Sequence, residues 1–97
     1  MNDEIKNIIN NIPRVENMKS NNGNDIANQF IIYGIDFKLF QSYKSPIALI
    51  MNDGKTYIFE DWDYSVTTGK YRNQFLGENK KETEQKLKNK EYIKVSQ

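Results

Sequence analysis

An acidic and aromatic segment, Glu60-Asp61-Trp62-Asp63-Tyr64, holds the densest group of chemically active side chains in this sequence. Its carboxylates could bind a hard divalent cation, because such cations take oxygen ligands. The spacing matches no calcium-binding loop, so metal binding is the weakest of three interpretations. In the second, Trp62 anchors a corner between sheet and helix while Asp63 caps the helix. In the third, all five residues form a protein-binding site, because tryptophan and tyrosine among carboxylates suit an interface anchor.

Basic residues gather in the C-terminal part of the chain. Residues 1–63 hold 6 basic and 9 acidic residues, a net charge of −3, and residues 64–97 hold 8 and 4, a net charge of +4, which sum to +1. Lysine attracts phosphate and aromatic rings stack on bases, so this half could bind single-stranded nucleic acid. The alternative is that these lysines simply form the solvent-exposed face of a helix. The candidate nucleic-acid-binding residues are Lys70, Arg72, Lys80, Lys81, Lys86, Lys88 and Lys90.

The composition argues against catalysis. The sequence contains no histidine and no cysteine. Serine and threonine hydroxyls therefore lack their usual activating base, and sulfur-ligated zinc is excluded. The five glycines stand singly, so no phosphate-binding loop is present. We expect a protein that is not an enzyme and has no catalytic residue, metal or cofactor.

The N-terminal region predicts a short helix followed by a loop. Ile5, Ile8, Ile9 and Ile12 recur at helical spacing, and Pro13 ends the pattern. The isoleucine stripe is expected to be a core face, with binding to a partner helix as the alternative. Residues 14–25 are polar and contain Ser20-Asn21-Asn22-Gly23-Asn24, which predicts a loop.

The middle of the chain predicts four strands, over residues 28–33, 35–43, 47–51 and 56–60. Phe40 interrupts the alternation of its strand, which indicates either a bulge or two covered faces. Asp53-Gly54 lies between two apolar runs and predicts a tight hairpin turn. Short connections between these strands favour an antiparallel meander.

Helical spacing returns after Tyr64. Tyr71 and Phe75 share a face of a helix that Ser65 or Thr67 can cap and Gly77 ends. A capping box at Asn79 and Glu82 begins a second helix. Residues 92–95 form a short last strand or simply pack against the sheet. The predicted fold is therefore α+β in a single domain, 1–97: an N-terminal helix, a four-stranded antiparallel meander and two C-terminal helices. One sheet face should be covered through Ile5, Ile9, Tyr71 and Phe75.

A family resemblance rests on residues 62–65 (WDYS), 67–72 (TTGKYR) and 75–78 (FLGE). In these segments the chain resembles a family of small uncharacterised proteins carried by phages and plasmids of A/T-rich Gram-positive bacteria. The dominance of asparagine, isoleucine and lysine, which have A/T-rich codons, fits such a source. The resemblance implies a mobile-element context, in which small non-enzymatic proteins often bind and inhibit host defence machinery such as CRISPR nucleases. It brings no catalytic residues.

Three functions are therefore expected in order of preference, the last of which is a purely structural or assembly protein that associates with itself. The first is a phage or mobile-element accessory protein that inhibits a host defence protein or nuclease complex by binding it, in the manner of an anti-CRISPR protein. The second is a nucleic-acid-binding module of phage or plasmid replication or transfer. No run reaches the ~18 apolar residues that cross a bilayer, and the N-terminus lacks a signal-peptide pattern. We expect no membrane contact and a location in the cytoplasm of the bacterial host.

Overall fold

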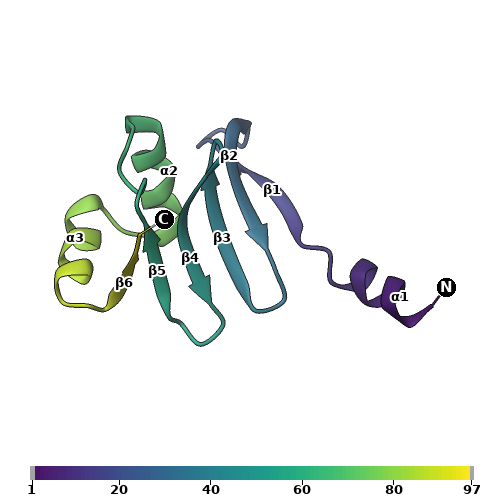
Figure 1. The fold of residues 1–97 in the computed structure, drawn as a ribbon. Coiled ribbons are helices and arrows are strands. Elements are labelled where there is room, and N and C mark those ends of the chain that lie inside the picture. Colours follow the sequence, from purple (N-terminus) through teal and green to yellow (C-terminus); the bar gives the residue numbers. More distant parts are fainter. Residues whose placement is uncertain (1, 97) are drawn as a thin grey trace.

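A computed structural model of the chain describes residues 2–96, which form an α+β fold (Figure 1). Within that range it contains three helices and six strands. In chain order these are α1 (Asp3–Asn10), β1 (Arg14–Lys19), β2 (Asp25–Tyr33), β3 (Phe37–Ser42), β4 (Ser45–Met51), β5 (Thr56–Phe59), α2 (Val66–Leu76), α3 (Lys80–Lys88) and β6 (Tyr92–Val95).

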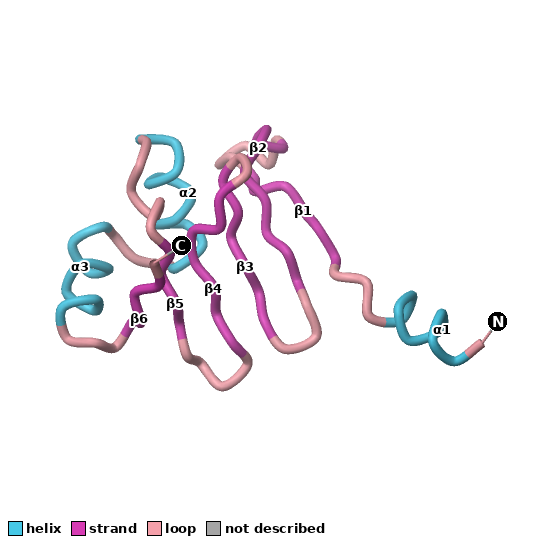
Figure 2. The backbone as a smooth tube through the Cα atoms, in the orientation of Figure 1, coloured by secondary structure: helices cyan, strands magenta, loops and turns pink. Residues whose placement is uncertain are grey.

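All six strands belong to one mixed sheet, in the order β1-β2-β3-β4-β5-β6. The first five are joined antiparallel, whereas β6 runs parallel to β5. A parallel pair needs a long crossover, which here consists of α2 and α3. Of these helices, α2 packs against the strands and α3 lies beside β6 at the edge of the sheet (Figure 2).

The four-stranded meander is confirmed as β2–β5, but the predicted loop over residues 14–25 was wrong. Its first half is the edge strand β1, which pairs with β2 from Arg14↔Tyr33 to Lys19↔Asp25. An edge strand exposes much of its surface, so its polar residues hid the strand from a hydropathy pattern. Only the tip of this segment is a turn, where Gly23 has a φ of 81°.

The predicted hairpin turn is confirmed, and of the two interpretations offered for Phe40 the structure contains the bulge, whose extra residue lies on β4. Gly54 adopts a φ of 91° between β4 and β5, as the Asp-Gly pair predicted. The register between β3 and β4 shifts after Phe40, which pairs with Ala48, while Gln41 pairs with Pro46. The extra residue, Ile47, is completely buried. The bulge therefore adds a side chain to the core.

The core lies between the sheet and α2. Met18, Phe40, Ile47 and Tyr71 form its buried cluster. Phe75 packs on Phe40 with ring centroids 5.9 Å apart. These contacts confirm that Tyr71 and Phe75 cover one face of the sheet.

The predicted role of α1 in this core was wrong. The helix forms, but none of its residues is buried. Ile5, Ile8, Ile9 and Ile12 are 45, 63, 49 and 66 % exposed. Figure 1 shows α1 standing beyond the β1 edge. Helical spacing identified an apolar stripe, but spacing alone does not say what the stripe contacts.

One buried amide lacks partners. The side chain of Gln29 is fully buried, and neither its nitrogen nor its oxygen has a hydrogen-bond partner among the described residues. An unsatisfied buried polar group costs about 1–3 kcal/mol. Gln29 is therefore a weak point of the core.

Replacing this amide should stabilise the fold. We expect Gln29→Met to raise the free energy of unfolding by about 1 kcal/mol, because an apolar side chain of similar shape needs no hydrogen bond. Thermal unfolding followed by circular dichroism would measure the change. Gln41→Met is the matched control and should destabilise, because the Gln41 Nε2 donates to the Tyr43 carbonyl at 2.7 Å. A lower melting temperature for Gln29→Met would contradict the prediction.

Candidate functional site

The corner between β5 and α2 is built around Arg72. The Arg72 side chain is 1 % exposed, and its Nη1 donates to the Asp63 Oδ1 at 3.0 Å and to the Trp62 carbonyl at 2.8 Å. The guanidinium carbon also lies 4.9 Å from the centroid of the Trp62 ring. A buried arginine needs such partners, because an unpaired charge in the interior is costly. Arg72 therefore ties α2 to the corner and does not reach the surface.

Asp63 serves as the counter-ion of this arginine. Its second oxygen accepts from the Lys80 Nζ at 2.6 Å. Partial burial raises the pKa of Asp63, but the hydrogen bonds from Lys80 and Arg72 outweigh that effect and hold the pKa below its ordinary 3.8. The predicted helix cap at Asp63 was wrong, since the Ser65 Oγ accepts from the Thr68 backbone nitrogen instead. Asp63 thus joins the corner to the middle of α2 and to the start of α3.

The remaining acidic-segment residues divide into engaged and free side chains. The Asp61 Oδ2 accepts from the Ser45 Oγ at 2.9 Å. The Trp62 ring lies near Arg72 and also near Lys94, whose Nζ is 5.7 Å from the ring centroid. Glu60 is exposed, and Tyr64 is 52 % exposed. Over residues 2–96 no three carboxylates gather as a metal site would require.

Just after the segment, Val66 presents its side chain to solvent. It is 91 % exposed on the first turn of α2. The sequence did not indicate this residue, because a single valine at the start of a helix is too common to predict a binding site. Tyr64 and Val66 together make the corner locally apolar on its outside.

A second charge centre, Glu78, holds α3 and β6 together. Its carboxylate accepts from the Thr83 Oγ1, from the Lys86 Nζ at 2.7 Å and from the Tyr92 hydroxyl at 2.7 Å. Burial raises the pKa of Glu78, yet these hydrogen bonds, led by that of Lys86, leave it below its ordinary 4.5. Burial and the Glu78 carboxylate raise the pKa of Tyr92 to about 12. Glu78 ends the FLGE segment of the family resemblance, but its structural role could not be predicted, because its partners lie 5 to 14 residues away.

The candidate nucleic-acid-binding residues are not brought together as one surface. Arg72 is buried, and Lys80 and Lys86 are paired with Asp63 and Glu78. The other candidates, Lys70, Lys81, Lys88 and Lys90, are exposed. Lys81 and Lys88 lie seven residues apart and so share a face of α3, but Glu84 lies between them on that face.

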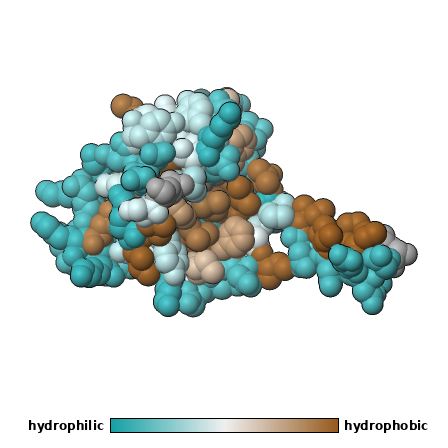
Figure 3. Space-filling model, in the orientation of Figure 1, coloured by the Kyte–Doolittle hydropathy of each residue, from teal (hydrophilic) through white to brown (hydrophobic). Residues whose placement is uncertain are grey.

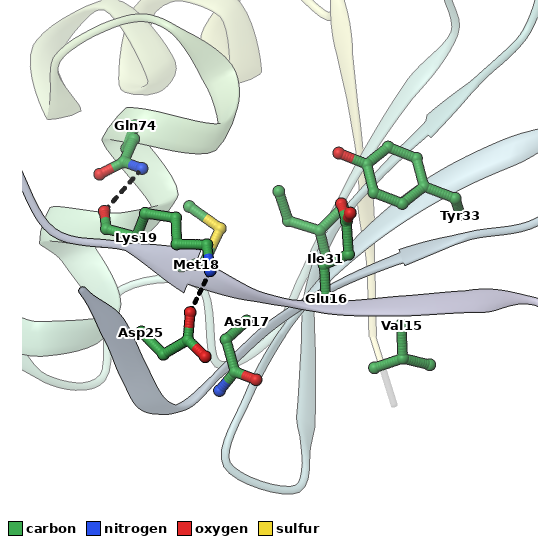
Figure 4. Close-up of a pocket in the computed structure, with 9 residues that line it drawn as sticks. All are labelled: Val15, Glu16, Asn17, Met18, Lys19, Asp25, Ile31, Tyr33 and Gln74. Atoms are coloured by element: carbon green, nitrogen blue, oxygen red, sulfur yellow. Dashed lines mark hydrogen bonds and ion pairs between the residues drawn. The ribbon is translucent and has the colours of Figure 1, made fainter. Parts of the chain in front are cut away.

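A cleft of about 440 Å³ opens between the β1–β2 pair and the end of α2 (Figure 4). The Gln74 side chain donates to the Lys19 carbonyl across it at 3.2 Å. Its charged side chains are paired: Lys19 with Asp25, and Glu16 with Arg14. This cleft therefore offers no free nucleophile or base among its lining charges.

The family of the chain follows from comparison with known proteins. The profile of a family described as a family of unknown function (DUF8033) matches residues 14–94. The chain belongs to this family. The DUF8033 match begins with β1, includes the Arg72 corner and Glu78, and leaves α1 outside. No curated protein and no solved structure matches the chain.

No helix among residues 2–96 has the length and apolarity to cross a membrane.

Removing the Arg72 counter-ion should weaken this DUF8033 fold. We expect Asp63→Asn to lower the free energy of unfolding by about 2 kcal/mol, less than the 3–5 typical of a fully buried pair, because the Asp63 side chain is 33 % exposed. Urea unfolding would measure it. Lys80→Met is the control and should have the clearly smaller effect, because Lys80 is exposed and water screens its ion pair. Equal effects of the two variants would contradict the assignment.

Acid should weaken the fold through the same carboxylates. The folded pKa values of Asp63 and Glu78 lie below their ordinary 3.8 and 4.5. Their contribution to the free energy of unfolding is therefore complete at pH values above the ordinary pKa values. It is lost as the pH falls from there through the lower pKa values of the folded state, because the unfolded chain binds the protons first. Urea unfolding at a series of acid pH values should show this loss, and Glu78→Gln should flatten it. A Glu78→Gln profile parallel to that of the wild type would count against the role of Glu78.

Proposed function

We propose that this protein is a non-enzymatic phage or mobile-element accessory protein that binds and inhibits a host defence complex in the bacterial cytoplasm. The proposal is supported by one observation: a rigid corner displays Tyr64 and Val66 to solvent, 52 and 91 % exposed. The function is that of a stoichiometric, anti-CRISPR-like inhibitor, which needs a binding surface and no catalytic group.

The corner is suited to binding because its backbone is held from inside. The Arg72 guanidinium donates to the carbonyl of Trp62 and to the side chain of Asp63, one and two residues before Tyr64. A surface fixed before contact loses little conformational entropy on binding. Exposed tyrosine on such a surface is a typical interface anchor.

The charged residues of the acidic segment support a smaller protein-binding site than residues 60–64, which the sequence predicted. Asp61 and Asp63 bind Ser45, Arg72 and Lys80 within the fold. Their removal would disturb the corner itself. The surface proposed to contact a partner is therefore Glu60, Tyr64 and Val66, with Trp62 beneath it.

Nucleic-acid binding is the second candidate function. It is supported by the exposure of Lys81, Lys88 and Lys90 on and just after α3. Glu84 reduces the field of the first two, which makes this candidate weaker than protein binding.

A direct test measures defence inhibition and binding together. The protein would be expressed in bacteria in which a CRISPR nuclease restricts a phage, and purified tagged protein would capture partners from the same cells after nuclease treatment. We expect restored plaque formation, one co-purifying protein, and a loss of affinity of roughly tenfold or more for the double variant Tyr64→Ala/Val66→Ala.

Ile35→Ala is the matched control, because Ile35 is 65 % exposed in the turn between β2 and β3 and lies outside the proposed site. It should bind as the wild type does. A folded Tyr64→Ala/Val66→Ala variant with full activity would refute the site. Binding that disappears on nuclease treatment and weakens in Lys81→Glu/Lys88→Glu would instead favour the nucleic-acid function.

A further inference from the structure

The sheet has one face that no helix covers. The strand register places fourteen side chains on it, of which twelve are apolar, two are amides and none is charged: Val15, Asn17, Phe30, Ile32, Phe37, Leu39, Gln41, Pro46, Leu49, Met51, Tyr57, Phe59, Ile93 and Val95. None of the fourteen is fully buried, whereas Phe40, Ala48 and Ile58 on the opposite face are 0 % exposed. An apolar surface of this extent on a water-exposed sheet marks an interaction site.

The helix α1 carries a second uncovered apolar surface. Its isoleucines Ile5, Ile8 and Ile9 share one face with Ile12, which follows the helix, and the four are between 45 and 66 % exposed. Asp3, Asn7 and Asn10 lie on the opposite face. Figure 3 shows apolar side chains over the strands and again along α1.

The connection to β1 directs α1 away from its own sheet. Only Asn11, Ile12 and Pro13 separate the helix from the strand. Pro13 holds Ile12 out of the helical region, so the chain enters the edge strand in an extended form. Folding α1 back over the same sheet would need a reversal within these three residues.

The helix-free face is also too large for α1 alone to cover it. Six strands about 4.8 Å apart and about five residues long give a footprint of roughly 400 Å². A helix of 8 residues is about 12 Å long and about 10 Å wide, and so covers about 120 Å². Less than a third of the face would be covered, and a second sheet is needed for the rest.

We propose that two copies of this chain associate through their helix-free faces, with the isoleucine stripe of each α1 packed on the sheet of the other copy. Stacked sheets and a helix on a sheet both lie about 10 Å from the surface they cover. Because α1 extends past the β1 edge of its own sheet, it lies in the same layer as that sheet. When two sheets stack face to face, this layer lies over the partner's sheet, so α1 can pack on the partner. The contact is isologous and closes with two copies.

Both faces are uncharged, so pairing them desolvates no ion. A stable dimer buries about 800 Å² of accessible surface on each partner. The helix-free face of roughly 400 Å² and the α1 stripe of about 120 Å² give a contact of roughly 500 Å² in projection, which approaches this class. The contact does not use Glu60, Tyr64 or Val66, so it is independent of the proposed function.

Light scattering after gel filtration tests the association. We expect a mass twice the 11.5 kDa of one chain. Ile5→Glu/Ile9→Glu should shift the population to monomer, because it puts charge into the stripe. Asn7→Glu/Asn10→Glu adds the same charge to the opposite helix face and should leave the dimer intact. A monomeric wild type, or equal behaviour of the two variants, would overturn the proposal.

Cysteine cross-linking separates exchange of α1 from closure on its own sheet, since the natural sequence has no cysteine. Under mild oxidation, a mixture of the single variants Ile9→Cys and Leu39→Cys should give a covalent dimer. The chain carrying both substitutions should also give covalent dimers. A disulfide formed within one chain, at monomer mass, would show that α1 covers its own sheet and would overturn the exchange.

Discussion

The parallel pairing of β6 with β5 is the constraint on which the architecture depends. Parallel neighbours cannot be joined by a hairpin, so the chain must leave the sheet and return. The crossover contains α2 and α3, and a crossover of this kind packs on a single face. One face therefore receives α2 and the buried core, whereas the other keeps an apolar surface that α2 does not cover.

Charged side chains, rather than buried apolar ones, fix the two ends of the crossover between β5 and β6. Arg72 and Asp63 join the exit from β5 to α2, and Glu78 joins α3 to the entry into β6. Each centre is small and combines hydrogen bonds from elements far apart in the sequence. α3 has little else to bury, since Thr83 is its only buried residue. Specific polar contacts thus orient a helix that hydrophobic packing alone would position loosely.

The sequence could predict those parts of the fold that depend on residues close together in the chain. The Asp-Gly turn, the Asn79 capping box and the Gly77 helix end each depend on residues within one turn of one another. The edge strand β1 and the parallel entry of β6 depend on partners elsewhere in the sheet, so their own patterns were weak. Arg72 illustrates the limit most clearly. In sequence it belongs to a basic run, and only the fold shows that Trp62 and Asp63 bury it.

Trp62 gives this arrangement an optical consequence. It is the single tryptophan of the chain, and its ring lies beside two cations, the Arg72 guanidinium at 4.9 Å and the Lys94 ammonium at 5.7 Å. One cation comes from α2 and the other from β6, so the indole sits where the two ends of the crossover meet. Its emission therefore reports on the local opening of the crossover, separately from loss of the strands, which circular dichroism follows.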